Sequence, residues 1–176
     1  MPLRTVLDSS DISRAIKRIS HEIFEANSGS EDLVLLGIPT RGVELAERID
    51  ASLAEIDPGY VSNLGVLDIT MYRDDSLDAE REIHPTQIPT SGIDDKVVVL
   101  IDDVLYSGRT VRSALDALID IGRPRQVKLA VLVDRGHREL PIRPDFVGKN
   151  LPTSAAERVN VMLANTDGSD QVVIEQ

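Results

Sequence analysis

Two adjacent carboxylates stand directly after an aliphatic run. Val97–Ile101 is followed by Asp102 and Asp103, and the next few residues include small and hydroxyl side chains, namely Ser107, Gly108 and Thr110. An unbroken aliphatic run indicates a strand buried on both faces, as in a parallel sheet covered by helices. Acids at the carboxyl end of such a strand lie where open α/β sheets bind ligands, and the loop after them suits an anion at a helix N-terminus. The segment therefore predicts a site for a phosphate beside a polyol.

The order of residue types separates this segment from other phosphate loops. It has no Gly-x-Gly-x-x-Gly pattern and no Lys after the last Gly, which argues against a dinucleotide fold and a P-loop. It resembles the phosphoribosyl pyrophosphate (PRPP) motif of type I phosphoribosyltransferases, in which a hydrophobic strand ends in two acids before a small-residue loop. The resemblance implies that Asp102 and Asp103 bind the ribose hydroxyls and, through water or PRPP, a Mg²⁺ ion. It assigns the 5′-phosphate to a loop made of Val104, Leu105, Tyr106, Ser107, Gly108, Arg109 and Thr110.

A second loop, which carries a permanent positive charge, follows an earlier predicted strand. Leu33–Ile38 ends at Pro39, and Thr40, Arg41 and Gly42 come next. The carboxyl ends of parallel strands meet at one edge of a sheet, so this loop is expected beside the two acids. Its guanidinium would then neutralise the departing pyrophosphate. Arg41 thus joins the two acids as a candidate catalytic residue, with a surface arginine as the alternative.

The segment from Arg73 to Asp95 is polar and charged, and it contains two prolines. That is long for a connection without secondary structure in a compact domain, so a mobile functional loop is predicted over about residues 73–95. Arg73 and Arg81 would cover the diphosphate when this loop closes. A solvated loop is the alternative for both arginines.

Composition limits the classes of protein that fit. The 176 residues suit one domain over 1–176, and 41% apolar content with 3% aromatic residues predicts an aliphatic core. Cys is absent, which excludes disulfides and thiolate metal sites and favours a cytoplasmic protein. The first 25 residues hold no long apolar run, so neither a secretion signal nor a membrane span is expected. The net charge of −11 argues against a broadly basic nucleic-acid surface but allows a local basic patch.

Strand and helix patterns alternate along the chain. Strands are predicted over about 33–38, 64–72, 97–101, 127–133 and 158–163. Helices are predicted over about 11–26, after Gly42, and over 110–121, the last with Leu115 and Ile119 among its inward residues. Residues 134–152 are expected to be irregular and 165–176 to form an acidic tail. The alternation predicts an α/β domain with a mostly parallel sheet.

Further runs extend the resemblance over roughly residues 3–163. The chain resembles the PyrR family of pyr operon regulators that are also uracil phosphoribosyltransferases. The runs that carry this are Gly37–Gly42, Asp68–Asp75, Ile101–Thr110, Val133–Arg143 and Gly148–Ser154. The resemblance implies the type I phosphoribosyltransferase fold, with a parallel central sheet flanked by helices, a small hood and a flexible loop. It also implies uracil and PRPP as substrates, UMP and pyrophosphate as products, and Mg²⁺ as cofactor.

The same resemblance places the base in the hood. Arg135 and Val159 match the base-binding positions, Val159 through its backbone. Arg135 would either bind the base or hold the diphosphate, and the sequence does not decide between these. Purine-using relatives carry a Lys where Asp134 stands here, which fits a different base.

The resemblance further implies binding of pyr messenger RNA, promoted by uridine nucleotides and opposed by PRPP. The family's RNA-contact positions coincide with Lys17, Arg18, His21, Arg138 and Lys149. The first three share one face of the first predicted helix, opposite its isoleucines. A solvated helix face is the alternative, since specific recognition of RNA loops usually recruits aromatic side chains that stack on bases.

Two other functions stay open at this point. The chain could be an RNA-responsive regulator with vestigial transferase activity, or a phosphoribosyltransferase for another base without an RNA role. The intact acids and Arg41 favour an active enzyme. Family members form homodimers and larger assemblies, so self-association is expected, and no membrane partner is.

Overall fold

The structure is a computed structural model that describes residues 2–73 and 85–176. Its main feature is a five-stranded parallel sheet with the order β3-β2-β4-β5-β6. The strands are β2 (Leu33–Gly37), β3 (Leu64–Val66), β4 (Val97–Leu105), β5 (Gln126–Asp134) and β6 (Phe146–Asn150). The central strand, β4, pairs with β2 on one side and β5 on the other, and its aliphatic run is buried because its alternate side chains enter core clusters on both faces of the sheet.

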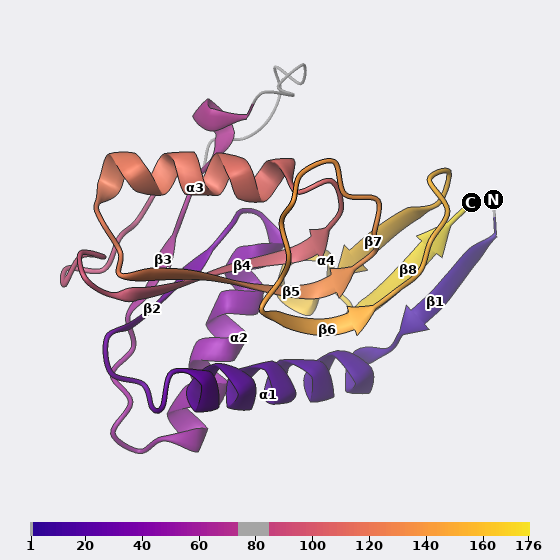
Figure 1. The fold of residues 1–176 in the computed structure, drawn as a ribbon. Coiled ribbons are helices and arrows are strands. Elements are labelled where there is room, and N and C mark those ends of the chain that lie inside the picture. Colours follow the sequence, from indigo (N-terminus) through magenta and orange to yellow (C-terminus); the bar gives the residue numbers. More distant parts are fainter. Residues whose placement is uncertain (1, 74–84) are drawn as a thin grey trace.

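Helices cover both faces of this sheet (Figure 1). The helices are α1 (Ser9–Ala26) and α2 (Arg41–Ile56) on one face, and α3 (Arg109–Ile121) with the 3₁₀ turn η1 (Thr70–Tyr72) on the other. Two aliphatic clusters fill the space between the layers, one under α1 and α2 and one under α3. The first helix begins where Asp8 accepts a hydrogen bond from the Asp11 N–H and Asp11 accepts one from the Asp8 N–H.

A second, antiparallel sheet lies beside the carboxyl ends of the parallel strands (Figure 1). Its order is β1-β8-β7, and its strands are β1 (Leu3–Leu7), β7 (Arg158–Met162) and β8 (Gln171–Glu175). The one-turn helix α4 (Ala164–Asp167) connects β7 to β8. The two chain ends lie side by side because β1 pairs with β8. Val159, which the resemblance places in the hood, lies on β7 of this sheet, and we call the sheet the hood.

The fold class expected from the sequence is confirmed, whereas several element bounds were wrong. The strand predicted over 64–72 ends at Val66, because Asp68 accepts hydrogen bonds from the N–H and hydroxyl of Thr70 and turns the chain into η1. The region 134–152 contains β6, and the predicted acidic tail forms α4 and β8. β1 was not predicted.

The outward face of α3 also differs from the expectation. Ile119 is 75% exposed and Leu115 is exposed as well, while Val111, Ala114 and Leu118 enter the core. The apolar side chains of α3 extend over a wider arc of the helix than the sheet covers. Two of the five residues expected to face inward therefore face outward.

The segment predicted to be a mobile loop is described in part. Residues 74–84, which include Arg81, lie outside the described residues. Residues 85–95 lie against β3, where Gln87 pairs with Val66 and Ile93 is buried. In the described part of the chain, no helix has the length and apolar character needed to cross a membrane.

Candidate active site

The two acids lie at the carboxyl end of the central strand, as their sequence position predicts. Asp102 is 8% exposed, and its Oδ1 accepts the N–H of Asp103 at 2.9 Å. Asp103 is half-buried, and its Oδ1 accepts the N–H of Val104 at 2.8 Å. We call these two residues the ribose pair. Each carboxylate is therefore fixed by the backbone of its own strand end before any ligand arrives.

The electrostatic environment of the ribose pair is unfavourable to two negative charges. Burial raises the pKa of the Asp102 carboxyl well above its usual range, and the neighbouring charge of Asp103 raises it further. The positive charge of Arg73 lowers this pKa, but it is the weakest of the contributions. Strongly perturbed carboxyls that lie beside a pocket are typical of functional sites rather than of structural ion pairs.

A pocket lies between Asp102 and the loop over residues 104–110, which we call the phosphate loop. Its lining comprises Arg73, Asp102, Val104, Leu105, Tyr106, Ser107, Gly108, Arg109, Thr110, Val111 and Val131. Arg73 reaches the loop from η1 and donates to the Thr110 hydroxyl at 3.3 Å. The N-cap residue of α3, Gly108, has no side chain to cap the helix, and the Ser107 hydroxyl accepts the N–H of Arg109, at 3.3 Å. The next N–H groups of the first turn are available to an anion.

Gly108 sets the course of the phosphate loop into α3. Its φ of 95° is left-handed, a conformation that other residues rarely adopt. A Cβ at this position would also lie 3.3 Å from the side chain of Ile142. Both observations explain why the loop needs glycine here.

The segment after β5 braces the phosphate loop from behind. Arg138 donates to the carbonyls of Tyr106 at 3.0 Å and Ile142 at 2.9 Å, and to the Asp134 carboxylate at 2.5 Å. The N–H groups of residues 139 and 140 both donate to the carbonyl of Ser107. Sequence reasoning assigned Arg138 to RNA, and the structure uses its guanidinium to join the phosphate loop to β5.

Arg135 is a buried cation between the phosphate loop and the segment that leads to β7. It donates to the Thr153 hydroxyl at 3.2 Å and to the Ser154 carbonyl at 3.1 Å. Its guanidinium carbon lies 4.2 Å from the centre of the Tyr106 ring. Val159, on β7, packs against the same core cluster as Val104. Both candidate base-binding residues thus border the carboxyl end of β4.

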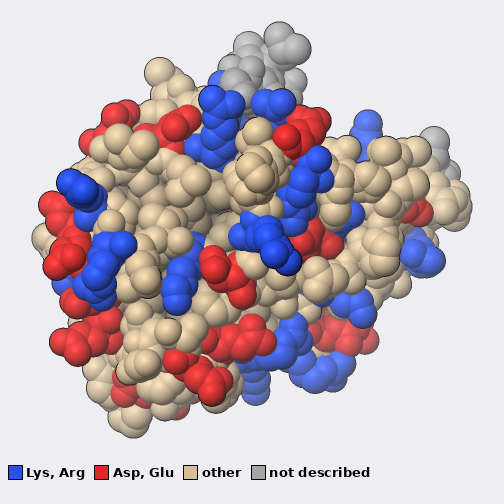
Figure 2. All heavy atoms as spheres, viewed as in Figure 1, with Lys and Arg blue, Asp and Glu red and all other residues tan. Residues whose placement is uncertain are grey.

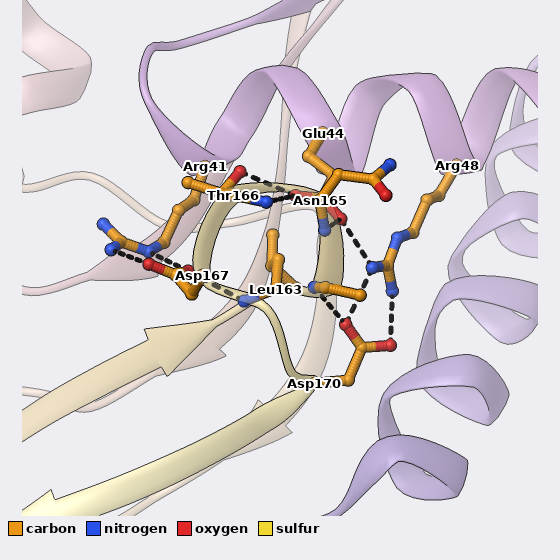
Figure 3. Close-up of polar contacts among 9 residues, drawn as sticks. Arg41, Glu44, Arg48, Leu163, Asn165, Thr166, Asp167 and Asp170 are labelled. Atoms are coloured by element: carbon orange, nitrogen blue, oxygen red, sulfur yellow. Dashed lines mark hydrogen bonds and ion pairs between the residues drawn. The ribbon is translucent and has the colours of Figure 1, made fainter.

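Arg41 begins α2 on the other side of β4 from the phosphate loop. Gly42 brings this loop against β4, since a Cβ there would lie 2.4 Å from the carbonyl oxygen of Ile101. The Arg41 guanidinium donates through Nε and Nη2 to the two carboxylate oxygens of Asp167, at 3.0 and 2.7 Å (Figure 3). The hydrogen bond with Asp167, and to a smaller degree the charge of Asp103, raise the pKa of Arg41. Arg41 is therefore within electrostatic reach of the ribose pair.

Asp167 belongs to a turn over residues 163–170 that is fastened to α2 (Figure 3). Buried Glu44 accepts the N–H of Asn165 at 3.1 Å and both the N–H and the hydroxyl of Thr166, at 3.0 and 2.6 Å. Arg48 bridges Glu44 to Asp170, with N–O distances of 2.6 and 2.7 Å. We call the five charged residues the tail latch: Arg41, Glu44, Arg48, Asp167 and Asp170.

The other residues that match the family's RNA-contact positions lie outside the pocket, on α1 and β6. Lys17, Arg18 and His21 are exposed on α1, and Lys149 is exposed on the neighbouring strand β6. Arg18 donates to the carbonyls of residues 147 and 148, at 2.9 and 2.5 Å, so it also ties α1 to β6. Figure 2 shows Lys and Arg gathered over α1, with Asp and Glu among them.

The structure thus divides the predicted site residues into three places. Asp102, Arg73 and the phosphate loop line one pocket. Thr40–Gly42 lie between the end of β2 and the first turn of α2. Lys17, Arg18 and His21 lie on the exposed face of α1. Sequence reasoning missed the tail latch beyond Arg41. Asp167 and Asp170 stand in a segment without a motif or periodicity, and Glu44 is a single acid on a predicted helix, so only their distant partners reveal a role.

Comparison with known proteins identifies the family. Residues 3–162 match the phosphoribosyl transferase domain model. A bifunctional protein PyrR of Leifsonia xyli subsp. xyli is 59% identical over all of this chain and 98% of its own length. The PyrR of Streptomyces coelicolor is 60% identical over 97% of this chain and 89% of its own length.

Solved structures support the same fold. The hypoxanthine phosphoribosyltransferase of Trypanosoma cruzi matches with a TM-score of 0.73 at 16% identity, covering 97% of this chain and 95% of that one. A hypoxanthine-guanine phosphoribosyltransferase from Bacillus anthracis matches with a TM-score of 0.72 at 14% identity, over 99% and 100% of the two chains. At such identities the likeness concerns the fold alone. With the domain match and the full-length relatives, these findings show that the chain belongs to the phosphoribosyltransferase family and, within it, to the PyrR proteins.

Proposed function

We propose that this chain transfers the 5-phosphoribosyl group of PRPP to uracil, giving UMP and pyrophosphate, and that it also binds pyr mRNA in response to uridine nucleotides. The observation that carries the enzymatic half is the pocket that joins Asp102 to the phosphate loop in a PyrR chain. A carboxylate beside a helix N-terminus suits a ribose that carries a 5′-phosphate.

The proposed reaction breaks the bond between the anomeric carbon and the diphosphate and forms one to a uracil nitrogen, which loses its proton to solvent or to the departing diphosphate. Its transition state has oxocarbenium character, so the protein needs to position groups and stabilise charge rather than supply a nucleophile. The phosphate loop holds the 5′-phosphate, and the ribose pair orients the ribose through its hydroxyls. Arg41 offsets the charge on the departing diphosphate, assisted by Arg73.

The residues present fit a Mg²⁺ ion that arrives with PRPP. In the described ranges 2–73 and 85–176, no three acidic or histidine side chains converge as a ready-made metal site. Mg²⁺ commonly takes one or two carboxylates together with water and substrate phosphates, which is what Asp102 and Asp103 offer. The bound ion would neutralise diphosphate charge and so relieve the repulsion within the ribose pair.

The base would lie against the hood. β7 is an edge strand of the small sheet, so one side of its backbone is available to a flat base that pairs like a further strand, as proposed for Val159. Arg135 has two partners in the 153–154 segment and stacks on Tyr106, so its position is fixed. This arrangement supports Arg135 as a fixed wall of the base site.

The enzymatic proposal is tested by measuring nucleotide formation from PRPP and Mg²⁺ with uracil, orotate, hypoxanthine and guanine in parallel. Turnover with uracil alone is the expected result. Turnover with a different base would retain the PRPP site and contradict the assignment of the base. Absence of turnover with all four would favour a regulator that has lost catalysis.

The proposed RNA-binding face consists of Lys17, Arg18, His21 and Lys149 on α1 and β6. Exposed cations of this kind contact phosphates and give salt-dependent affinity. Arg18 is a poor residue to test because its replacement also removes the two hydrogen bonds to β6. Lys17 is exposed, and no ion pair or hydrogen bond of its side chain is found in the described part of the chain.

Lys17→Glu is expected to weaken binding of a transcribed pyr leader RNA by about tenfold and to reduce the salt dependence of affinity, with UMP formation unchanged. The matched control is Arg4→Glu, which makes the same charge change at an exposed residue of β1, in the small antiparallel sheet. Filter binding at several salt concentrations measures both. Equal losses in the two variants would contradict an RNA surface on α1.

Self-association as a homodimer or larger homo-oligomer belongs to the same proposal. The outward residues of α3 and the following segment support it, because Leu115, Ile119 and Val127 line an apolar groove with Pro124. Exposed apolar surface of this kind is typical of contacts between protein chains.

A further inference from the structure

Arg41 and Asp167 form an ion pair between segments 126 residues apart in the sequence. Asp167 accepts from Nε and Nη2, so it occupies the lateral edge of the guanidinium (Figure 3). The geometry is the bidentate one that fixes both planes. The two side chains retain 35% and 18% of their exposure, so the pair is partly shielded from water.

Asp167 is itself fixed by its own segment. Its Oδ2 accepts the N–H of Leu163 at 2.9 Å, which closes the turn. The turn is fastened independently to α2, where Glu44 binds residues 165 and 166 and Arg48 binds Asp170. The carboxylate that holds Arg41 is therefore part of a rigid body with the helix that Arg41 begins. These contacts hold the turn in place without the ion pair between Arg41 and Asp167.

The pair leaves Arg41 able to bind a second anion. A guanidinium has five N–H groups on a planar fork, and the lateral edge uses one on Nε and one on Nη2. The end edge, formed by Nη1 and the other Nη2 hydrogen, has no partner within the residues that the structure describes. A diphosphate oxygen pair can take that edge while the carboxylate keeps the first one.

We propose that Asp167 is a positioning residue for PRPP: it holds the Arg41 guanidinium in advance, with the free edge presented to the diphosphate. The inference rests on the proposed function, because it gives Arg41 the diphosphate as its ligand. A long arginine side chain loses much rotational freedom when it becomes ordered on a ligand. Ordering it beforehand on a rigid carboxylate removes that loss from the binding step.

The opposite role for the carboxylate is competition. A negative charge beside Arg41 repels diphosphate, and if the ligand had to displace Asp167, its removal would tighten PRPP binding. The free edge of Arg41 argues against displacement, since both anions can be bound at once. The direction of the change in the KM for PRPP therefore decides between the two roles.

The test measures KM and kcat for PRPP with Asp167→Asn, which keeps the volume and one acceptor for the Leu163 N–H. We expect the KM for PRPP to rise about tenfold and kcat to stay within about twofold, because the diphosphate already carries its charge in the bound substrate. Asp170→Asn is the matched control. It breaks the pair between the same turn and Arg48, two helical turns along α2, and is expected to leave the KM unchanged.

Arg41→Ala separates this inference from the function on which it rests. We expect Arg41→Ala to raise the KM for PRPP, and Asp167→Asn to have no further effect in that background. Calorimetry with inorganic pyrophosphate and Mg²⁺ should show the same pattern without turnover. If Arg41→Ala leaves the KM unchanged, the proposed role of this loop is overturned. If Arg41→Ala raises the KM while Asp167→Asn leaves it unchanged or lowers it, or if Asp170→Asn raises it equally, the positioning role alone is overturned.

Discussion

The carboxylates of the ribose pair and those of the tail latch differ in how their negative charges are compensated. Each carboxylate of the tail latch has an arginine partner and at least one backbone N–H donor. In the ribose pair, each carboxylate accepts one backbone N–H, and the charge nearest to Asp102 is that of another acid.

The pKa values follow this difference. Burial raises the pKa of Glu44, but hydrogen bonds from Thr166, Asn165 and Arg48 outweigh it, so the net shift is downward. The pKa of Asp167 is lowered chiefly by its hydrogen bond with Arg41. Burial raises the pKa of Asp102, and no comparable set of donors opposes it.

The contrast separates carboxylates that stabilise the fold from carboxylates that await a ligand. The tail latch favours the folded state at neutral pH, since its acids are better satisfied there than in water. Asp102 opposes folding at neutral pH, because burial and the charge of Asp103 raise its pKa. In the proposed function, ribose hydroxyls and a cation would satisfy its charge. Substitutions in the two groups should therefore have opposite effects on stability and unequal effects on activity.

The largest effect is expected from Asp103→Asn. The amide keeps an acceptor for the Val104 N–H, so the strand end survives. The variant loses the charge that orients the ribose and contributes to the cation site, and kcat should fall by about 100-fold or more. Steady-state kinetics with uracil and PRPP measure this, with Tm as the check on folding. Unchanged kinetics would contradict a role for Asp103 in the site. They would also contradict the proposed difference in function between the ribose pair and the carboxylates of the tail latch.

Glu44→Gln tests the tail latch. Glu44 is buried and accepts from Asn165, Thr166 and Arg48, so its neutralisation should cost about 2 kcal/mol in the free energy of unfolding at pH 7. Glu47→Gln is the matched control, because Glu47 lies exposed on the same helix. Urea unfolding of both variants gives the comparison. Equal stabilities would mean that the latch contributes nothing to the fold.

The pH dependence of that loss has a defined sign. The folded-state pKa of Glu44 is below its ordinary value of 4.5, so its contribution is present above that value and disappears as pH falls through the folded pKa. The difference between wild type and Glu44→Gln should accordingly shrink at low pH. A difference that grows on acidification would contradict the assignment.

Sequence reasoning located the ribose pair and the phosphate loop because their chemistry is local. One run from Ile101 to Thr110 holds the strand end, the acids, the left-handed Gly108 and the start of α3. The order of residue types in such a run fixes where each group lies, whatever the rest of the chain does. The fold class could be predicted for the same reason, since buried aliphatic strands alternate with amphipathic helices.

The tail latch could not be predicted because its geometry is set by packing between distant segments. Glu44 and Thr166 are 122 residues apart, and Asp167 is one of 30 acidic residues with no motif around it. The strand β6 was missed for a related reason. Its sequence, Phe-Val-Gly-Lys-Asn, has weak alternation, and it is ordered by pairing with β5 at the sheet edge.

The smallest change in stability, with the opposite sign, is expected from Asp102→Asn. The amide retains an acceptor for the Asp103 N–H and removes a buried charge. The variant should unfold at a higher temperature than wild type at pH 8, by about 1 kcal/mol in stability, while it loses turnover. Few substitutions at buried polar residues stabilise a protein, so a gain here would distinguish the ribose pair from the tail latch.

The sign of the pH dependence makes this test sharper. The folded-state pKa of Asp102 is raised, so the cost of its charge is fully present above that pKa and vanishes as pH falls toward the ordinary value of 3.8. The stability gained by Asp102→Asn should therefore decrease on acidification, from the alkaline side of that pKa downward. In the Asp103→Asn background the gain should be smaller at alkaline pH, because the charge of Asp103 contributes to the raised pKa. A gain independent of pH and of Asp103 would show that packing, not charge, sets the stability of this strand end, and the two groups of carboxylates would no longer differ in kind.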